Sequence, residues 1–299
     1  MKRDHLSLAA GFLPGLSLLI VLLCRRYIQS GASMPTWTQG IPVEWIWVLV
    51  EFLVFLLPFL VLLVLFGKKK DRALSFQVKE FSVRAIPMLL TTAIAAAIAN
   101  LLLGDLISGL MGQVYSDVHV FSFLLTERSS LWALLLAVVL IPVIGGQFLY
   151  GQACMRVYSP CGGIAALIVC ALSYSLLTGS PATLLGTFIS AVAFFYIGWA
   201  MNSVWAVMLA HGVYSIMHLL LLFVADAYSG QELWSIVRLV MIFIFGLFLY
   251  LSMHSMEQLM EKGMFRRLER LRREWLINNI IVSPGLWMTI FLFVIDWIA

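Results

Sequence analysis

Long apolar runs, unbroken by charged residues, constrain the fold of this chain more than any other feature. Of its 299 residues, 62% are hydrophobic and 11% are charged, whereas soluble domains carry roughly 25% charged residues. A lipid bilayer removes the need to cover an apolar surface with polar groups. The backbone of a membrane-spanning segment must satisfy its own hydrogen bonds, which leaves helices and closed barrels. The runs are continuous and do not alternate with polar residues, so they favour helices.

We therefore predict an all-α fold, a polytopic transmembrane helical bundle with about eight or nine spans of about 20 residues each. The spans are expected at about 6–24, 44–66, 85–104, 130–150, 163–180, 183–200, 203–225, 233–253 and 279–298. The first is expected to be a retained helix, because Arg25 and Arg26 follow it where a signal-peptide cleavage site would need small residues. The last is the weakest, because Pro284 and Gly285 interrupt it.

The distribution of basic residues predicts the orientation. With the N-terminus in the cytoplasm, 15 of the 19 lysines and arginines fall on the cytoplasmic side, as the positive-inside rule requires. The two densest clusters, at 68–72 and 266–273, are separated by an even number of spans and so fall on the same side. We expect a multi-pass protein of the cell membrane with a cytoplasmic N-terminus.

Residues 254–275 differ in kind from the spans. Apolar residues recur there every three or four positions, the spacing of one helix face: Met256, Met260, Met264, Leu268, Leu271 and Trp275. Basic residues occupy the other faces: Lys262, Arg266, Arg267, Arg270 and Arg273. The pattern predicts a basic amphipathic helix at the inner leaflet, in contact with anionic lipids. A plain connecting helix is the alternative.

Ionisable groups at membrane depth are costly, and each is a candidate for function. Glu51 in the second span and Arg238 in the eighth both lie in the outer half of their spans, and we expect them to form an intramembrane ion pair. His211, Ser215 and His218 in the seventh span share one helix face, because they are four and three residues apart. The two histidines are a possible metal site only with ligands from other helices. Buried histidines that hydrogen-bond to a neighbouring helix are the commoner case.

Other chemistry-bearing residues have simpler explanations. The outer loop expected over 105–129 carries three carboxylates and a histidine, which we interpret as solvated residues: Asp105, Asp117, His119 and Glu127. The four cysteines match no zinc or redox spacing and are expected to be packed free thiols: Cys24, Cys154, Cys161 and Cys170.

The stretch from Ile141 to Gly151 reads IPVIGGQFLYG. It resembles the first signature of the CPBP membrane proteins, a family of CAAX prenyl endopeptidases and bacteriocin-processing intramembrane proteases. In that signature a proline precedes two adjacent glutamates, and an arginine follows four residues after the second. The segment from Tyr174 to Thr178 resembles the second signature, an aromatic residue and then a histidine. The segment from His211 to Ser215 resembles the third, a histidine and then asparagine or aspartate.

The resemblance covers about residues 130–220 and implies three regions. Transmembrane helices and an outer loop occupy 1–129, a CPBP-like, CAAX-protease-like core occupies 130–225, and C-terminal helices with the basic helix occupy 226–299. Counted along helices that end near Val157 and begin near Gly163, Gly145 and Thr178 should lie at similar depth in antiparallel neighbours.

The chain departs from the family pattern where the chemistry would be. Gly145 and Gly146 stand in the places of the glutamates, Tyr150 in that of the arginine and Thr178 in that of the second-signature histidine, so that only His211 remains. A general base must titrate near neutral pH, and glycine, tyrosine and threonine cannot replace a carboxylate. We expect no catalytic residue. The former site should be filled by packing or left as a small cavity that is poor in polar groups.

The leading hypothesis is a non-catalytic CPBP-like protein, a pseudoenzyme that is a binding partner or scaffold for another membrane or envelope protein. One alternative is an intramembrane endopeptidase with residual or altered catalytic residues, in which His211 and His218 work with a carboxylate such as Glu51. Another is a lipid or small-molecule transporter, which would need a continuous polar path through the bundle. We expect contact with the bilayer and with anionic inner-leaflet lipids, and neither nucleic acid nor a cofactor.

Overall fold

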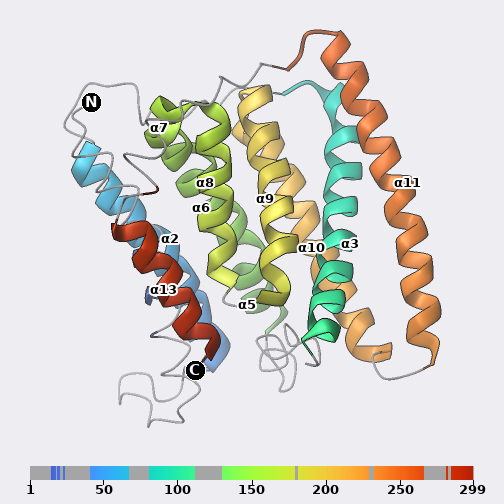
Figure 1. The fold of residues 1–299 in the computed structure, drawn as a ribbon, viewed down its shortest axis with the longest axis horizontal. Helices are drawn as coiled ribbons and strands as arrows, with labels where there is room; N and C mark the ends of the chain where they lie inside the picture. Colours follow the sequence, from blue (N-terminus) through green and yellow to red (C-terminus); the bar gives the residue numbers. More distant parts are fainter. Residues whose placement is uncertain are drawn as a thin grey trace. The chain divides into compact units, whose positions relative to one another are not determined.

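The computed structural model is built from helices, and the residues that it describes contain no β-strand (Figure 1). The described residues are 15–17, 19–20, 23, 41–66, 81–111, 130–178, 181–228, 232–265, 281 and 284–298. Six helices among them are long and apolar enough to cross a membrane: Glu44–Val61, Val83–Leu110, Leu131–Tyr158, Pro181–Met201, Val204–Tyr228 and Leu233–Glu261. Two shorter apolar helices, Gly163–Thr178 and Leu286–Ile295, accompany them. The predicted all-α fold is confirmed among the described residues, and six of its helices have the length and composition of membrane spans.

Every predicted span contains helical residues, and in the first span the described residues 15–17, 19–20 and 23 are helical. The longer elements are α2 (Val43–Phe66), α3 (Ile86–Leu110), α9 (Pro181–Met201), α10 (Val204–Tyr228), α11 (Leu233–Glu261) and α13 (Pro284–Ile298). Two bounds correct the sequence reading. Asp105, expected on a loop, lies within α3. Pro284 begins α13 and does not interrupt it. Backbone N–H groups in the first turn of a helix have no acceptor within the helix, so proline, which lacks an N–H, is tolerated there.

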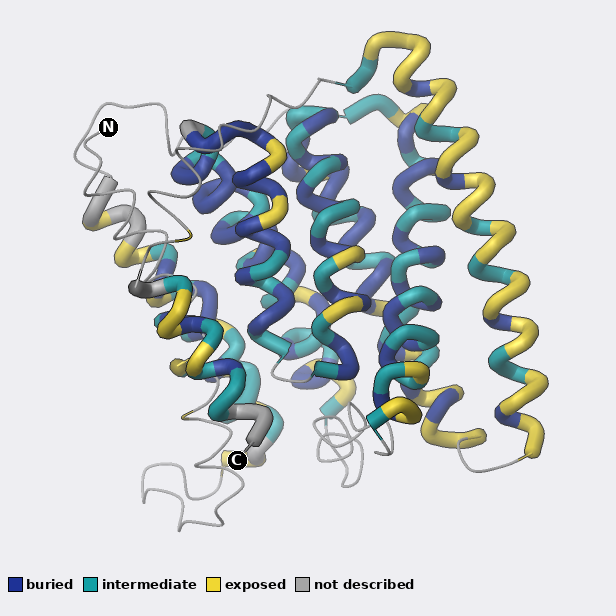
Figure 2. Tube along the Cα trace, in the orientation of Figure 1, coloured by how far each residue is buried: buried dark blue, intermediate teal, exposed yellow. Residues whose placement is uncertain are grey.

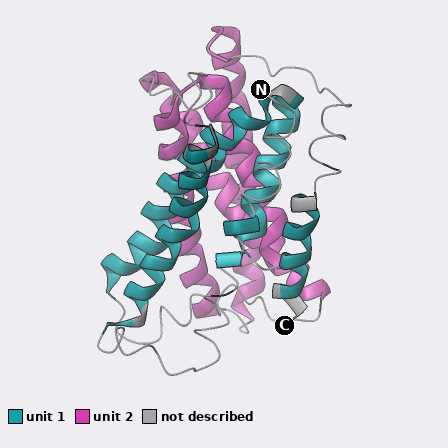
Figure 3. Ribbon diagram, turned by 90° about the vertical axis from the view of Figure 1, so that its left-hand side faces the viewer, with its two compact units in different colours: residues 1–76, 124–179, 269–299 teal, residues 77–123, 180–268 magenta. Residues whose placement is uncertain are grey.

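The helices form two compact units, coloured separately in Figure 3. Unit 1 comprises residues 1–76, 124–179 and 269–299, and unit 2 comprises residues 77–123 and 180–268. Each unit combines segments that are far apart in the sequence. The sequential division that the family resemblance implied stays a prediction.

The central helical run of unit 1 has a π-helical segment on each side of its glycine pair. It passes through α5 (Leu131–Leu135), the π-helix η4 (Leu136–Leu140), α6 (Ile141–Gly146), the π-helix η5 (Gln147–Cys154) and α7 (Met155–Tyr158). Pro142 has no N–H to donate to the preceding turn, and widened turns accommodate such gaps. The short 3₁₀ turn η6 (Ser159–Cys161) then leads into α8 (Gly163–Ser175) and η7 (Leu176–Thr178), and α8 packs against η5 and α7.

In unit 2, α3 is the central helix and packs against α9, α10 and α11; the 3₁₀ turn η3 (Val83–Ala85) precedes it. Buried alanines on α3, such as Ala93 and Ala97, let neighbouring helices approach closely. Figure 2 shows α3 buried or partly buried along most of its length and α11 exposed along most of its length. The exposed side chains of α11 include Leu239 and Phe243, and a long apolar face of this kind suits contact with lipid.

The end of α11 corrects the predicted amphipathic helix. Gly263 has a φ of 67°, and its N–H donates to the Met260 carbonyl while the N–H of Met264 donates to Leu259. This is the Schellman arrangement that ends many helices. Residues 254–261 are therefore the last turns of α11, and no single helix covers 254–275. Exposed Lys262 follows, and the four predicted lipid-facing arginines, Arg266, Arg267, Arg270 and Arg273, lie outside the described residues.

Replacing Gly263 with alanine should lower the thermal stability of the chain. A Cβ at this position meets no atom within 4 Å, so the cost is the left-handed backbone alone, about 1–2 kcal/mol. Gly246→Ala in the same helix is the matched control: its Cβ also meets nothing, and alanine in a helix interior is favoured by roughly 0.5–1 kcal/mol. Tryptophan-fluorescence melting in detergent measures both. Equal melting of the two variants would contradict the assigned helix end.

Candidate functional site

Gly146, Tyr150 and Tyr174 come together in unit 1. Tyr150 on η5 is fully buried, and its ring meets that of Tyr174 on α8 edge to face, with centroids 5.7 Å apart and planes inclined by 69°. A Cβ on Gly146 would lie 2.9 Å from Cε2 of Tyr174, closer than side chains normally approach. The Tyr174 ring therefore occupies the space that a side chain at position 146 would need.

Phe55 of α2 occupies the corresponding space at Gly145. A Cβ there would lie 2.6 Å from Cγ and 2.7 Å from Cβ of Phe55, and because the Cβ is fixed to the backbone, side-chain rotation does not move it away. An apolar hollow of about 490 Å³ adjoins this contact between α2 and the run 136–149, lined by Phe52, Leu140, Phe148 and other apolar residues. Aromatic rings and hydrocarbon thus surround the glycine pair.

The remaining residues singled out in unit 1 have local roles. The Thr178 hydroxyl donates to the Ser175 carbonyl at 2.8 Å, which gives a carbonyl near the end of the helix a hydrogen-bond donor. Cys154, Cys161 and Cys170 are free and buried, as predicted, and Cys24 lies outside the described residues. Burial raises the pKa of the Cys161 thiol, which keeps that thiol protonated.

In unit 2, α10 carries the predicted histidine face. His211 and Ser215 are buried, and Phe194 of α9 stacks on His211 with centroids 5.5 Å apart. Tyr214 lies 5.9 Å from His211 and stacks on His218 at 5.7 Å with nearly parallel rings. His211 is thus packed against two aromatic rings, and His218 is stacked on one of them.

The possible metal site at His211 and His218 finds no further ligand in the part of the chain that the structure describes. Within those residues, no group of three or more histidine, cysteine, aspartate or glutamate side chains is placed to hold a metal ion.

Asn100 is a buried polar residue that the sequence reading overlooked. Its side-chain amide donates to the Tyr214 hydroxyl at 2.6 Å and links α3 to α10. Beside it, Gly186 lets α9 approach so closely that a Cβ there would lie 2.7 Å from the Asn100 Cα. The signal was available, because Asn100 is an amide in an otherwise apolar run, and such residues commonly bind helices together.

Arg238 has a partner that the sequence did not suggest. The pair predicted with Glu51, which lies on α2 in unit 1, stays a prediction, and the guanidinium forms an ion pair with Asp105 of α3 at 3.1 Å. The reason lies in the bounds of α3: the helix continues past the expected end of the span to Leu110, so Asp105 faces α11 instead of standing on a loop.

The positions that resemble the family signatures are divided between the units. Gly145, Gly146, Tyr150, Tyr174 and Thr178 belong to unit 1, and His211 and Ser215 belong to unit 2. Comparison with protein-family models, with curated proteins and with solved structures found no match to this chain. Membership of the CPBP family therefore stays a prediction.

Proposed function

We propose that this chain is a non-catalytic, CPBP-like protein of the cell membrane that acts by binding another membrane or envelope protein. The proposal includes a bundle of about eight or nine spans and a cytoplasmic N-terminus. The observation that carries it is the filling of the glycine pair: the rings of Phe55 and Tyr174 lie where side chains at Gly145 and Gly146 would begin.

Peptide-bond hydrolysis needs an activated water and a positioned base. At Gly145 and Gly146 no base is available, and the adjoining hollow is lined by apolar side chains, which give a water molecule no hydrogen-bond partners. The histidine that the resemblance retains, His211, is stacked against Phe194. Packing of this kind supports a structural role for the imidazole.

Binding, unlike hydrolysis, needs only a surface of suitable shape and chemistry. Having Gly145 and Gly146 in place of the two glutamates of the family pattern leaves such a surface intact. The test is affinity purification of the tagged chain from native membranes in mild detergent. One membrane or envelope protein should co-purify in near-stoichiometric amount, and His211→Asn should retain it equally. An unrelated multi-pass protein with the same tag is the control. A chain that purifies without any stoichiometric partner would contradict the proposal.

The basic segment after α11 is proposed to contact anionic lipids of the inner leaflet. In a peptide covering 262–275, glutamine in place of Arg266, Arg267, Arg270 and Arg273 should weaken binding to anionic vesicles by about 1 kcal/mol for each charge removed. Equilibrium dialysis against vesicles measures the effect, and neutral vesicles are the control, with weak binding of both peptides. Equal binding of the two peptides to anionic vesicles would exclude electrostatic contact.

A further inference from the structure

A long apolar groove runs along unit 2, with α3 as its floor and α9 and α11 on its sides. Its volume is about 680 Å³, within the roughly 300–1,000 Å³ of sites that hold small molecules. Small side chains create it, because Ala95, Ala96 and Ala99 of α3 and Ala193 of α9 leave the space between larger neighbours unfilled. Apart from two polar pairs and Ser190, its walls are hydrocarbon.

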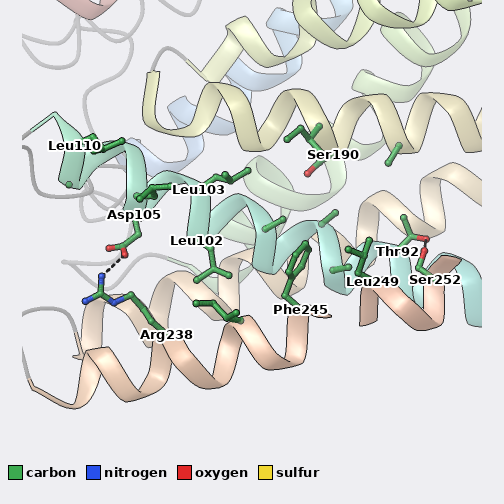
Figure 4. A pocket seen from close by; sticks show the side chains of 18 residues that line it. Thr92, Leu102, Leu103, Asp105, Leu110, Ser190, Arg238, Phe245, Leu249 and Ser252 are labelled. Carbon is green, nitrogen blue, oxygen red and sulfur yellow. Dashed lines mark hydrogen bonds and ion pairs between the residues drawn. The ribbon is translucent and has the colours of Figure 1, made fainter. Parts of the chain in front are cut away.

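The polar pairs lie at opposite ends of the groove (Figure 4). At one end the hydroxyls of Thr92 and Ser252 bond to each other at 2.6 Å. At the other end Arg238 and Asp105 form their ion pair. The first end is neutral, with one hydroxyl donating to the other, so charge is presented at the Arg238 end alone.

The ion pair leaves most of its bonding capacity open. A guanidinium has five N–H donors and a carboxylate has two acceptor oxygens. The contact between Arg238 and Asp105 joins one guanidinium nitrogen, Nη1, to one oxygen, Oδ2, at 3.1 Å. The Arg238 side chain is 42% exposed and that of Asp105 is 23% exposed. The mouth of the groove therefore offers a cation and an anion side by side, each with unused donors or acceptors.

The depth of the ion pair matches that of lipid headgroups. α11 has 29 residues, about 44 Å at 1.5 Å per residue, which equals the roughly 40–45 Å of a bilayer with its headgroup layers. Arg238 is five residues from the start of α11, about 8 Å along the axis. For a helix along the membrane normal, that position is near the boundary between headgroups and hydrocarbon.

The length of the groove suits one acyl chain. Ser252 lies 14 residues beyond Arg238 on α11, about 21 Å along the helix axis, which exceeds the roughly 15 Å hydrocarbon depth of one leaflet. An acyl chain that enters at the ion pair can thus lie in the groove through the whole hydrocarbon depth of one leaflet.

We infer that this groove is a binding site for a phospholipid with a primary-ammonium headgroup, of the phosphatidylethanolamine class. Its phosphate accepts hydrogen bonds from the open N–H groups of Arg238, its ammonium donates to Asp105, and one acyl chain fills the groove along the alanines of α3. The selection follows from the paired charges. A choline headgroup has no N–H to donate to Asp105, and a glycerol headgroup has no cation.

The test uses the full-length chain, purified in mild detergent and titrated with phosphatidylethanolamine, phosphatidylcholine or phosphatidylglycerol of identical acyl chains. Intact-protein mass spectrometry measures the dissociation constant of each complex. Phosphatidylethanolamine should bind about tenfold more tightly than the other two, because a charge-assisted hydrogen bond contributes at least that factor. Equal binding of the three lipids would overturn the inference.

Three variants locate the site. Arg238→Gln should weaken binding of all three lipids by about tenfold. Asp105→Asn should remove the preference for phosphatidylethanolamine while phosphatidylglycerol binds at least as well as before. Ala99→Phe should abolish binding of all three by filling the groove, and Ala193→Leu repeats that test from the opposite wall if Ala99→Phe melts early. Arg84→Gln and Glu257→Gln, exposed charges of unit 2 outside the groove, are the controls and should change nothing.

Other outcomes identify a different occupant. Lipid binding that survives both groove-filling variants would place the lipid elsewhere and overturn the inference. A co-purifying protein that is lost from Ala99→Phe and Ala193→Leu, with no lipid preference in the native chain, would make the groove a protein-docking surface and also overturn it. Loss of lipid selectivity with an unchanged protein partner would support the lipid site and separate it from the proposed scaffold function.

Discussion

Replacing Gly146 or Gly145 with glutamate should abolish accumulation of folded protein. At Gly145 the new Cβ would lie within 2.7 Å of two Phe55 carbons, and at Gly146 within 2.9 Å of the Tyr174 ring. Each carboxylate would also be buried without a cation, at a cost of several kcal/mol. Size-exclusion chromatography of the fluorescently tagged chain in mild detergent measures the folded fraction, which should fall to near zero.

Alanine separates the steric part of this effect from the charge. Gly145→Ala should destabilise the chain by about 1–3 kcal/mol, the usual cost of overpacking. Gly212→Ala on α10 is the matched control, because a Cβ there meets no atom within 4 Å, and it should be neutral or slightly stabilising. Folded Gly145→Glu protein in native yield would mean that the space beside Phe55 is open, contrary to the packing described.

The second large effect is expected at the crossing of α3 and α9. Gly186→Ala would place a Cβ 2.7 Å from the Asn100 Cα, and because this is a backbone atom, the two helices must separate. The separation would also strain the hydrogen bond from Asn100 to Tyr214. We expect destabilisation of about 3 kcal/mol or more, above the usual cost of one added methyl group because two interactions are lost.

Thermal melting in detergent measures this loss, with Gly212→Ala again as the control. Tyr214→Phe tests the hydrogen bond by itself, since it leaves the Asn100 amide without that acceptor and should cost about 1–3 kcal/mol. A Gly186→Ala variant that melts like the native chain would show that α3 and α9 are not in close contact at this point.

The helices of this chain were predictable because membrane spans follow from apolar length alone. The bounds were less predictable, because they depend on backbone chemistry at single residues. Gly263 ends α11 by adopting a positive φ, yet the apolar spacing of residues 254–275 continues through it and predicts one longer helix. Periodicity reports which face is apolar, and it does not report where the backbone turns.

Partners across helices were harder to predict than the helices themselves. Depth alone suggested Glu51 as a partner for Arg238, but depth does not say that α3 lies beside α11. α3 and α11 pack together, and that contact places Arg238 beside Asp105, with which it forms an ion pair. The approach of Tyr174 to Gly146 was within reach of sequence spacing, because α8 returns antiparallel to the preceding run. The contact of Phe55 with Gly145 was not, since nothing in the sequence pairs α2 with α6.

The most direct test of the central claim, that this chain does no peptide-bond chemistry, is a cleavage assay on the purified native protein. It would be reconstituted in vesicles and given prenylated peptides and leader-peptide substrates, with products followed by mass spectrometry. Because Gly145 and Gly146 offer no base and their space is filled by Phe55 and Tyr174, we expect the native chain and His211→Ala to be equally inactive. Cleavage by the native chain that disappears in His211→Ala would contradict the account.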